Sequence, residues 1–392
     1  MERKTLTFGE SNVAAITAFA GTVAGSLIVS LTAMLIALAA GNGVGGDAVD
    51  AVAGSAGMTV LLLALTQVLL FAGAAFYLSV FRRVSYFKLF SFGFGEIGGA
   101  GLKKAALLPL ITVGAILLFL PFAELFVYIL SLFGYSYSGT EIGGGDNAGS
   151  FVTMLLAVAV LPAFGEEMLF RGVYLNGARR RGSFFAVCFS SLVFMLYHGS
   201  PLQTVHQFLL GLILAYVAVV TGHIGYGIII HFLNNFIGLF MGYIPFGELP
   251  PGILVLMYAV WAVVGFCLLV PSLKAFTRLC DKENGISNAD GAKRGFFETA
   301  AYDIAGVFTG AFRLIARKTS PKELISEFNA KYDPRNKFGG GLGGADNDNT
   351  VFLFGKDEPK KLPPSAIVLI VGFSLLWLIS LSLGFLNGWL SV

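Results

Sequence analysis

Charged side chains are scarce in this chain, since Asp, Glu, Lys and Arg make up only 12% of its 392 residues. Soluble domains carry roughly 25% charged residues, so the composition excludes an ordinary soluble protein. Cysteine is rare too, and the three cysteines have neither the spacing of a metal site nor that of a disulfide framework. The net charge of +3 indicates no nucleic-acid partner, because the basic residues gather at the ends of apolar runs.

The chain instead contains long apolar runs, and several of them exceed the roughly 20 residues that cross a bilayer. We therefore expect an all-α, polytopic transmembrane helix bundle. The first run follows Arg3 and Lys4, but it is longer than the apolar core of a signal peptide, so we interpret it as a span. The predicted spans, about nine, are 13–40, 58–81, 105–133, 150–178, 183–199, 203–221, 224–243, 252–276 and 365–390.

Basic residues alternate between the predicted connecting loops. Loop 82–104 carries five of them, and the fourth span ends in Arg179-Arg180-Arg181. No Lys or Arg occurs in loops 41–57, 134–149, 200–202 and 244–251. We therefore expect a multi-pass protein of the cell membrane, and the positive-inside rule predicts a cytoplasmic N-terminus.

Two adjacent carboxylates in the fourth span, Glu166 and Glu167, are the clearest functional signal. A charged group in the bilayer costs about 2.5–3.5 kcal/mol on insertion scales, so it is rarely there without a role. Glu167 and Arg171 are four residues apart and should pair as a structural lock. Glu166 is rotated by about 100°, and such a carboxylate can act as a general base for water. The alternative is that both glutamates pair with arginines or cap a helix near the interface.

Two later spans carry imidazoles. His198 ends the fifth span, and His231 and Asn235 share one face of an apolar helix, which must point into the protein. The alternatives are an interfacial histidine and an interhelical hydrogen bond. Straight helices place Glu166 and His231 in the cytoplasmic half and His198 nearer the outer side. A tilted helix, or a fifth helix that is broken or starts later, would reconcile these depths.

Four further polar residues lie in or beside the predicted spans. We interpret His206 and His223 as structural or interfacial, and Asn234 as a packing residue. Glu124 lies in the third span near the outer interface, and we assign no role to it.

The three motifs Glu-Glu-x-x-x-Arg, Phe-x-x-x-His and His-x-x-x-Asn follow one another in separate apolar spans. Together they resemble the CPBP (CAAX-protease and bacteriocin-processing, or ABI) family of intramembrane proteases. The resemblance covers about residues 100–245. It implies that Glu166 activates water, that His198 helps to position the water, and that His231 and Asn235 stabilise the oxyanion.

The resemblance also implies supporting roles for Glu167 and Arg171 and a packing role for Phe194. Together with the predicted spans and the polar stretch after 276, the resemblance divides the chain into four parts. These are a two-span region with a basic cytoplasmic loop (1–100), a CPBP-like protease core (101–276), a cytoplasmic polar segment (277–364) and an extra transmembrane helix (365–390). Within the polar segment, the spacing of apolar residues from 297 to 315 predicts an amphipathic helix, and 339–348 has the composition of a flexible linker.

The chain lacks the His-Glu-x-x-His spacing that places two zinc ligands on one helix turn. This absence favours a glutamate-type mechanism without a cofactor. A zinc site built from Glu166, His198 and His231 stays open as the alternative, because two histidines and one glutamate are a known zinc ligand set.

We therefore predict an intramembrane endopeptidase that acts on a peptide or a membrane protein within or next to the lipid bilayer. Eukaryotic members of the family trim prenylated CAAX tails, so the resemblance also allows a lipidated substrate. Water is expected to enter through a polar cavity that opens to the cytoplasm. A proton-coupled transporter is one alternative, since buried Glu and His also mark proton paths, although no internal repeat is present. A non-catalytic membrane partner, of the bacteriocin-immunity type, is the other.

Overall fold

The computed structural model describes residues 6–39, 56–82, 99–136, 148–241, 244, 249–283, 321–332 and 361–390. All regular elements in these residues are helices, as the composition predicts. Seven helices are long and apolar enough to cross a membrane, and two shorter apolar helices, α8 (Ser183–Tyr197) and α10 (Gly225–Met241), lie among them. The prediction of an all-α bundle with about nine spans is confirmed.

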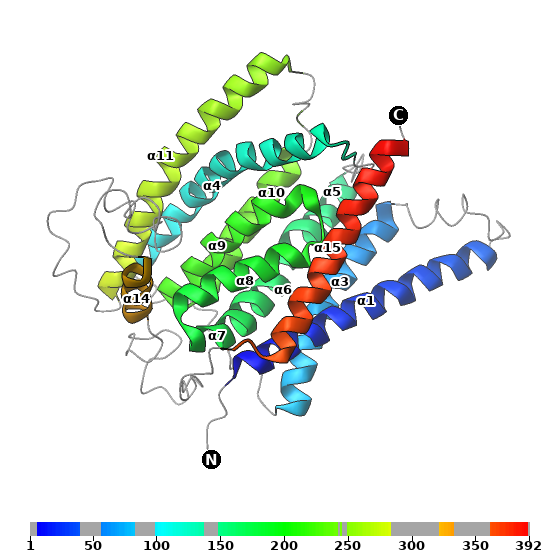
Figure 1. The fold of residues 1–392 in the computed structure, drawn as a ribbon, viewed down its shortest axis with the longest axis horizontal. Helices are drawn as coiled ribbons and strands as arrows, with labels where there is room; N and C mark the ends of the chain where they lie inside the picture. Colours follow the sequence, from blue (N-terminus) through cyan, green and yellow to red (C-terminus); the bar gives the residue numbers. More distant parts are fainter. Residues whose placement is uncertain are drawn as a thin grey trace.

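The helices run up and down through the bundle (Figure 1). The remaining long helices are α1 (Phe8–Ala39), α3 (Ala56–Phe76), α4 (Gly99–Leu132), α9 (Thr204–Thr221), α11 (Pro251–Glu283) and α15 (Pro364–Leu390), together with a continuous helix that contains α5 (Ala148–Met154), α6 (Leu161–Glu167) and α7 (Leu175–Ala178). We call the end of the bundle that carries Arg179–Arg181 the basic end. α8 starts directly after it, at Ser183.

Glycines let pairs of helices approach closely, as is usual where apolar helices pack in lipid. α4 and α11 meet at Gly114 and Gly265. A Cβ atom on Gly265 would lie only 2.4 Å from the backbone nitrogen of Leu118, and one on Gly114 would lie 2.6 Å from that of Leu269. Larger residues would push these two helices apart.

The helix from Ala148 to Arg181 is not regular, and its irregularity surrounds the two glutamates. It contains two π-helical segments, Leu155–Val160 and Met168–Tyr174, which flank α6. Pro162 has no N–H, so it cannot bond the carbonyl four residues back, which belongs to Val158. π-helical turns are often found at functional sites.

A short helix that the sequence did not suggest, α14 (Pro321–Lys331), docks on the basic end. The Ser183 hydroxyl donates to the Tyr332 carbonyl at 2.7 Å, and Lys331 pairs with Asp281 at 2.8 Å. α11 extends past the predicted end of its span at 276, to Glu283, and so supplies Asp281 for this contact.

The predicted amphipathic helix (297–315) and linker (339–348) lie outside the described residues. The four-part division of the chain stays a prediction. α15, the last predicted span, packs on α1 and α8.

Candidate active site

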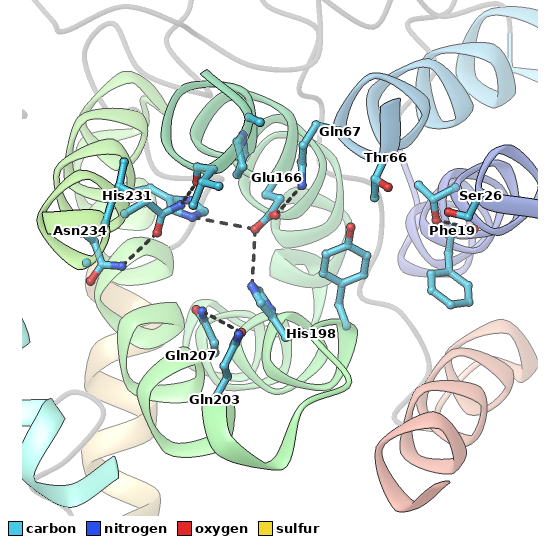
Figure 2. Close-up of a pocket in the computed structure, with 18 of the residues that line it drawn as sticks. Phe19, Ser26, Thr66, Gln67, Glu166, His198, Gln203, Gln207, His231 and Asn234 are labelled. Carbon is cyan, nitrogen blue, oxygen red and sulfur yellow. Dashed lines mark hydrogen bonds and ion pairs between the residues drawn. The ribbon is translucent and has the colours of Figure 1, made fainter. Parts of the chain in front are cut away.

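Glu166, His198 and His231, which lie far apart in the sequence, meet in the interior of the bundle (Figure 2). Glu166 is only 4% exposed. Its Oε2 atom lies 3.9 Å from the Nε2 atom of His198 and also 3.9 Å from that of His231. Glu166 Oε2 has no hydrogen-bond partner among the described residues. Two imidazoles thus flank one buried carboxylate oxygen that is free to bind a small molecule such as water.

His198 and Glu166 lie at a similar distance from the basic end of the bundle, because the same number of helical residues separates each of them from it. α8 has 15 residues, so His198 stands 15 positions beyond Ser183, and Glu166 stands 15 positions before Arg181. At about 1.5 Å per residue, each lies roughly 22 Å along its helix from the basic end. The expectation that His198 lies nearer the outer side than Glu166 is therefore wrong.

Glu167 has two partners at the same oxygen. Its Oε1 atom accepts from Arg171 Nη1 at 2.8 Å, as the spacing predicts, and lies 3.0 Å from His231 Nδ1. Glu167 and Arg171 are fully buried. Arg171 also donates to the carbonyl of Gly211 at 3.2 Å, and its guanidinium lies 4.3 Å from the centre of the Phe194 ring. Glu167 thus does more than form an ion pair with Arg171, because it also orients the imidazole of His231.

Asn235 is oriented by a series of hydrogen bonds. Its Nδ2 atom donates to the Val158 carbonyl at 3.1 Å, the carbonyl that Pro162 cannot bond. Asn235 Oδ1 accepts from Asn234 Nδ2 at 3.1 Å, and Asn234 Oδ1 lies 3.1 Å from His206 Nε2. Asn234 is therefore a polar partner of Asn235 and not only a packing residue, and His206 has a structural role as expected.

Gln67, in α3, is a site residue that the sequence analysis missed. Its Nε2 atom donates to Glu166 Oε1 at 3.0 Å, and the side chain is buried. Gln67 Oε1 has no hydrogen-bond partner among the described residues. The only signal in the sequence is a lone amide inside the second predicted span, outside the region that resembles the CPBP family.

A cavity of about 860 Å³ adjoins these side chains. Among the described residues that line it, Glu166 is the only acidic one, and none is Lys or Arg. The lining residues come from α1, α3, the helix 148–181, the end of α8, the α8–α9 turn, the start of α9, and α10. They are Phe19, Thr22, Val23, Ser26, Leu27, Thr66, Gln67, Met154, Ala157, Val158, Pro162, Glu166, Tyr197, His198, Gln203, Gln207, His231, Asn234, Asn235, Gly238 and Leu239.

Of the other residues noted in the sequence, Phe194 packs against the site, whereas Glu124 and His223 lie outside it. The Phe194 ring packs edge-on against those of His198 and His231, at centroid distances of 4.7 and 5.8 Å. Glu124 lines a neighbouring cavity of about 470 Å³. His223 lies in the α9–α10 turn, away from the large cavity, and burial lowers the pKa of its imidazole.

The candidate metal ligands do not fit zinc closely. Among the described residues, no group of three or more His, Cys, Asp and Glu side chains is arranged to hold a metal ion. Zinc–ligand bonds of about 2.0–2.2 Å put neighbouring tetrahedral ligand atoms about 3.4 Å apart. The separations from Glu166 Oε2 to the two histidine nitrogens, 3.9 Å each, are wider.

Comparison with known proteins gives one match. Residues 148–237 match the family described as type II CAAX prenyl endopeptidase Rce1-like. No curated protein and no solved structure matches the chain. The matched residues include the three motifs, and the family supports a protease with a peptide substrate in a membrane environment. This segment of the chain is similar to the Rce1-like CAAX endopeptidases, in agreement with the resemblance of the three motifs to the CPBP family.

Proposed function

We propose that this protein is a glutamate-type intramembrane endopeptidase, in which Glu166 activates the water that cuts a peptide bond. The observation that carries the proposal is the buried, unpartnered Oε2 atom of Glu166 between two imidazole nitrogens. A buried acceptor without a partner is costly, so such an atom is expected to bind a molecule. A water molecule there would contact both a base and the cavity that admits the substrate.

The hydrogen bonds of the two histidines define which ring nitrogens carry protons. His198 Nδ1 lies 2.8 Å from the Phe194 carbonyl, which only accepts, so this nitrogen carries a proton. His231 Nδ1 carries one as well, because it faces the Glu167 carboxylate. In the neutral rings, both Nε2 atoms are therefore acceptors that point towards Glu166 Oε2.

With the protons in these positions, the two histidines have different roles in the reaction. The water donates one hydrogen to Glu166 Oε2 and the other to His198 Nε2, which leaves an oxygen lone pair for attack on the substrate carbonyl. Glu166 takes the proton as general base and returns it to the amine that leaves when the C–N bond breaks. His198 orients the water through its fixed tautomer.

His231 and Asn235 would stabilise the oxyanion of the tetrahedral intermediate. His231 can donate from Nε2 to the oxyanion only as an imidazolium, and its Nδ1 atom would then still donate to the Glu167 carboxylate at 3.0 Å. Asn235 uses one amide hydrogen on the Val158 carbonyl and keeps the second for the oxyanion. Loss of one such donor typically costs about 10²–10³ in rate.

We propose that no metal takes part, because the separations around Glu166 Oε2 are wide for zinc. Cleavage by the purified protein should be unchanged after incubation with EDTA or 1,10-phenanthroline, followed by their removal. Activity that is lost after this treatment and restored by zinc would overturn the metal-free mechanism.

Gln67 is proposed to hold Glu166 in its reactive orientation, because it occupies Oε1 and leaves Oε2 for water. Gln67→Leu should lower kcat about 10- to 100-fold with little change in KM, since a hydrogen bond to a charged group is worth about 1.5–3 kcal/mol. Gln67→Asn, which keeps the amide on a shorter side chain, should recover part of the loss. A kcat equal to that of wild type in Gln67→Leu contradicts this role.

The function itself is tested by comparing protein termini in membranes from cells that make wild type or Glu166→Gln at equal levels. New N- and C-termini that occur only with wild type would support proteolysis and identify substrates. Identical profiles, with both proteins folded, would favour a non-catalytic partner or a transporter.

A further inference from the structure

We propose that the active-site cavity opens to the non-cytoplasmic side of the membrane, and that its substrates are membrane proteins cut near the outer end of a transmembrane segment. The direction of the opening follows from the cavity and the charges of the chain. The nature of the substrate rests in addition on the proposed function.

In the helix 148–181, in α8 and in α10, the residues that line the cavity lie at the catalytic residues or on their far side from the basic end. In the helix 148–181, the lining residues run from Met154 to Glu166, and none lies in the following 15 positions up to Arg181. α8 contributes only its last residue, Tyr197, beside His198 in the turn. α10 contributes residues only from His231 onward, in the part that runs away from the basic end.

Aromatic side chains fill the bundle between the site and the basic end. Phe170, one turn beyond Glu166, is 1% exposed, and its ring packs on Phe194 at 5.2 Å. Tyr174, a further turn on, is fully buried against Phe8 and Phe189, at centroid distances of 6.0 and 6.4 Å. This layer blocks entry of water or peptide from the basic end.

The basic end is the cytoplasmic end by the positive-inside rule. It carries Arg179–Arg181, and the loop 82–104 with five basic residues connects helices on the same side. The loops of the opposite end (41–57, 134–149, 200–202 and 244–251) contain no Lys or Arg. The sequence alone led us to expect a cytoplasmic opening, but the position of the cavity points to the other side.

The walls of the cavity suit the end of a transmembrane segment. α1 contributes an apolar wall, in which Val23 is 44% and Leu27 is 65% exposed. Further polar groups come from the α8–α9 turn and the first turn of α9, where Gln207 donates to Gln203 at 3.4 Å. A peptide that leaves the bilayer at the outer side could place apolar side chains along α1 and its backbone near the glutamines. The described lining residues include no Lys or Arg, which disfavours an acidic peptide beside Glu166.

Thiol labelling of intact cells tests the direction of the opening without any activity measurement. The three native cysteines, Cys188, Cys267 and Cys280, are first replaced by alanine. A single cysteine is then placed at the mouth of the cavity (Gln203→Cys) or, as the control, at the exposed end of α11 (Lys282→Cys). A membrane-impermeant maleimide should label Gln203→Cys in intact cells and Lys282→Cys only after the cells are broken. Labelling of Lys282→Cys in intact cells, or of Gln203→Cys only in broken cells, overturns the proposal.

The cut sites test the substrate class. Termini that depend on Glu166 should map to the outer ends of transmembrane segments, and termini in cytoplasmic sequences would overturn this part of the proposal. If no terminus depends on Glu166, the proposed function fails, whereas the labelling result still decides the side of the opening. The two failures are therefore distinguishable.

Discussion

Purified Glu166→Gln protein is expected to cleave its substrate about 10³-fold more slowly than wild type. An amide cannot take a proton from water at neutral pH, and general-base catalysis typically contributes about 10²–10⁴ in rate. The substitution keeps the size of the side chain, and its amide oxygen can still accept the hydrogen bond from Gln67. The loss should therefore appear in kcat, with the fold intact.

Single-turnover cleavage of a substrate identified from membrane termini is the measurement, with thermal unfolding of each protein in detergent alongside. Glu124→Gln is the matched control, because it makes the same change in another span, outside the catalytic cluster. It should retain the wild-type rate. A Glu166→Gln protein that cleaves at more than a tenth of the wild-type rate would show that another group is the base.

Arg171→Met is expected to destabilise the protein by about 3–5 kcal/mol, because it leaves the carboxylate of Glu167 buried without its cation. Both side chains are fully buried, and Arg171 also bonds the Gly211 carbonyl in α9. Thermal unfolding in detergent should show a large fall in Tm or no folded protein. Arg278→Met, on the exposed face of α11, should change stability by no more than about 0.5 kcal/mol.

A double variant separates the structural role of this pair from its role in the site. Glu167→Met with Arg171→Met removes both charges, and replacing a buried pair by apolar residues is often neutral. Stability should return in large part. Activity should stay on the order of 10²- to 10⁴-fold low, because His231 Nδ1 has lost the carboxylate that holds its tautomer. A double variant that is stable and fully active would mean that Glu167 has no part in catalysis.

The membrane helices were predictable from sequence because their signal is local. A run of about 20 apolar residues has few alternatives to a helix in lipid, where each backbone group must bond within its own segment. The short helix α14 was missed for the same reason. Its 11 residues carry no long apolar run, and contacts such as Lys331 with Asp281 join residues 50 positions apart.

The identity of the candidate site residues was also largely readable, because an ionisable or amide group in an apolar span needs an explanation. Glu166, His198, His231 and Asn235 all stood out in this way. Gln67 did not stand out, because a single amide is less costly in a span than a carboxylate. It also belongs to none of the three motifs. Its importance depends on a contact with a residue 99 positions away.

The sequence by itself determined the helical class of this protein, its spans, and the pairing of Glu167 with Arg171, because these depend on composition and on short spacings along one helix. Only the tertiary structure decided that the side chains of Glu166, His198 and His231 meet, and that Glu167 also bonds His231. It alone showed which residues line the cavity beside Glu166. Each of these depends on how helices cross and where aromatic side chains fill the space between them, which no local pattern records.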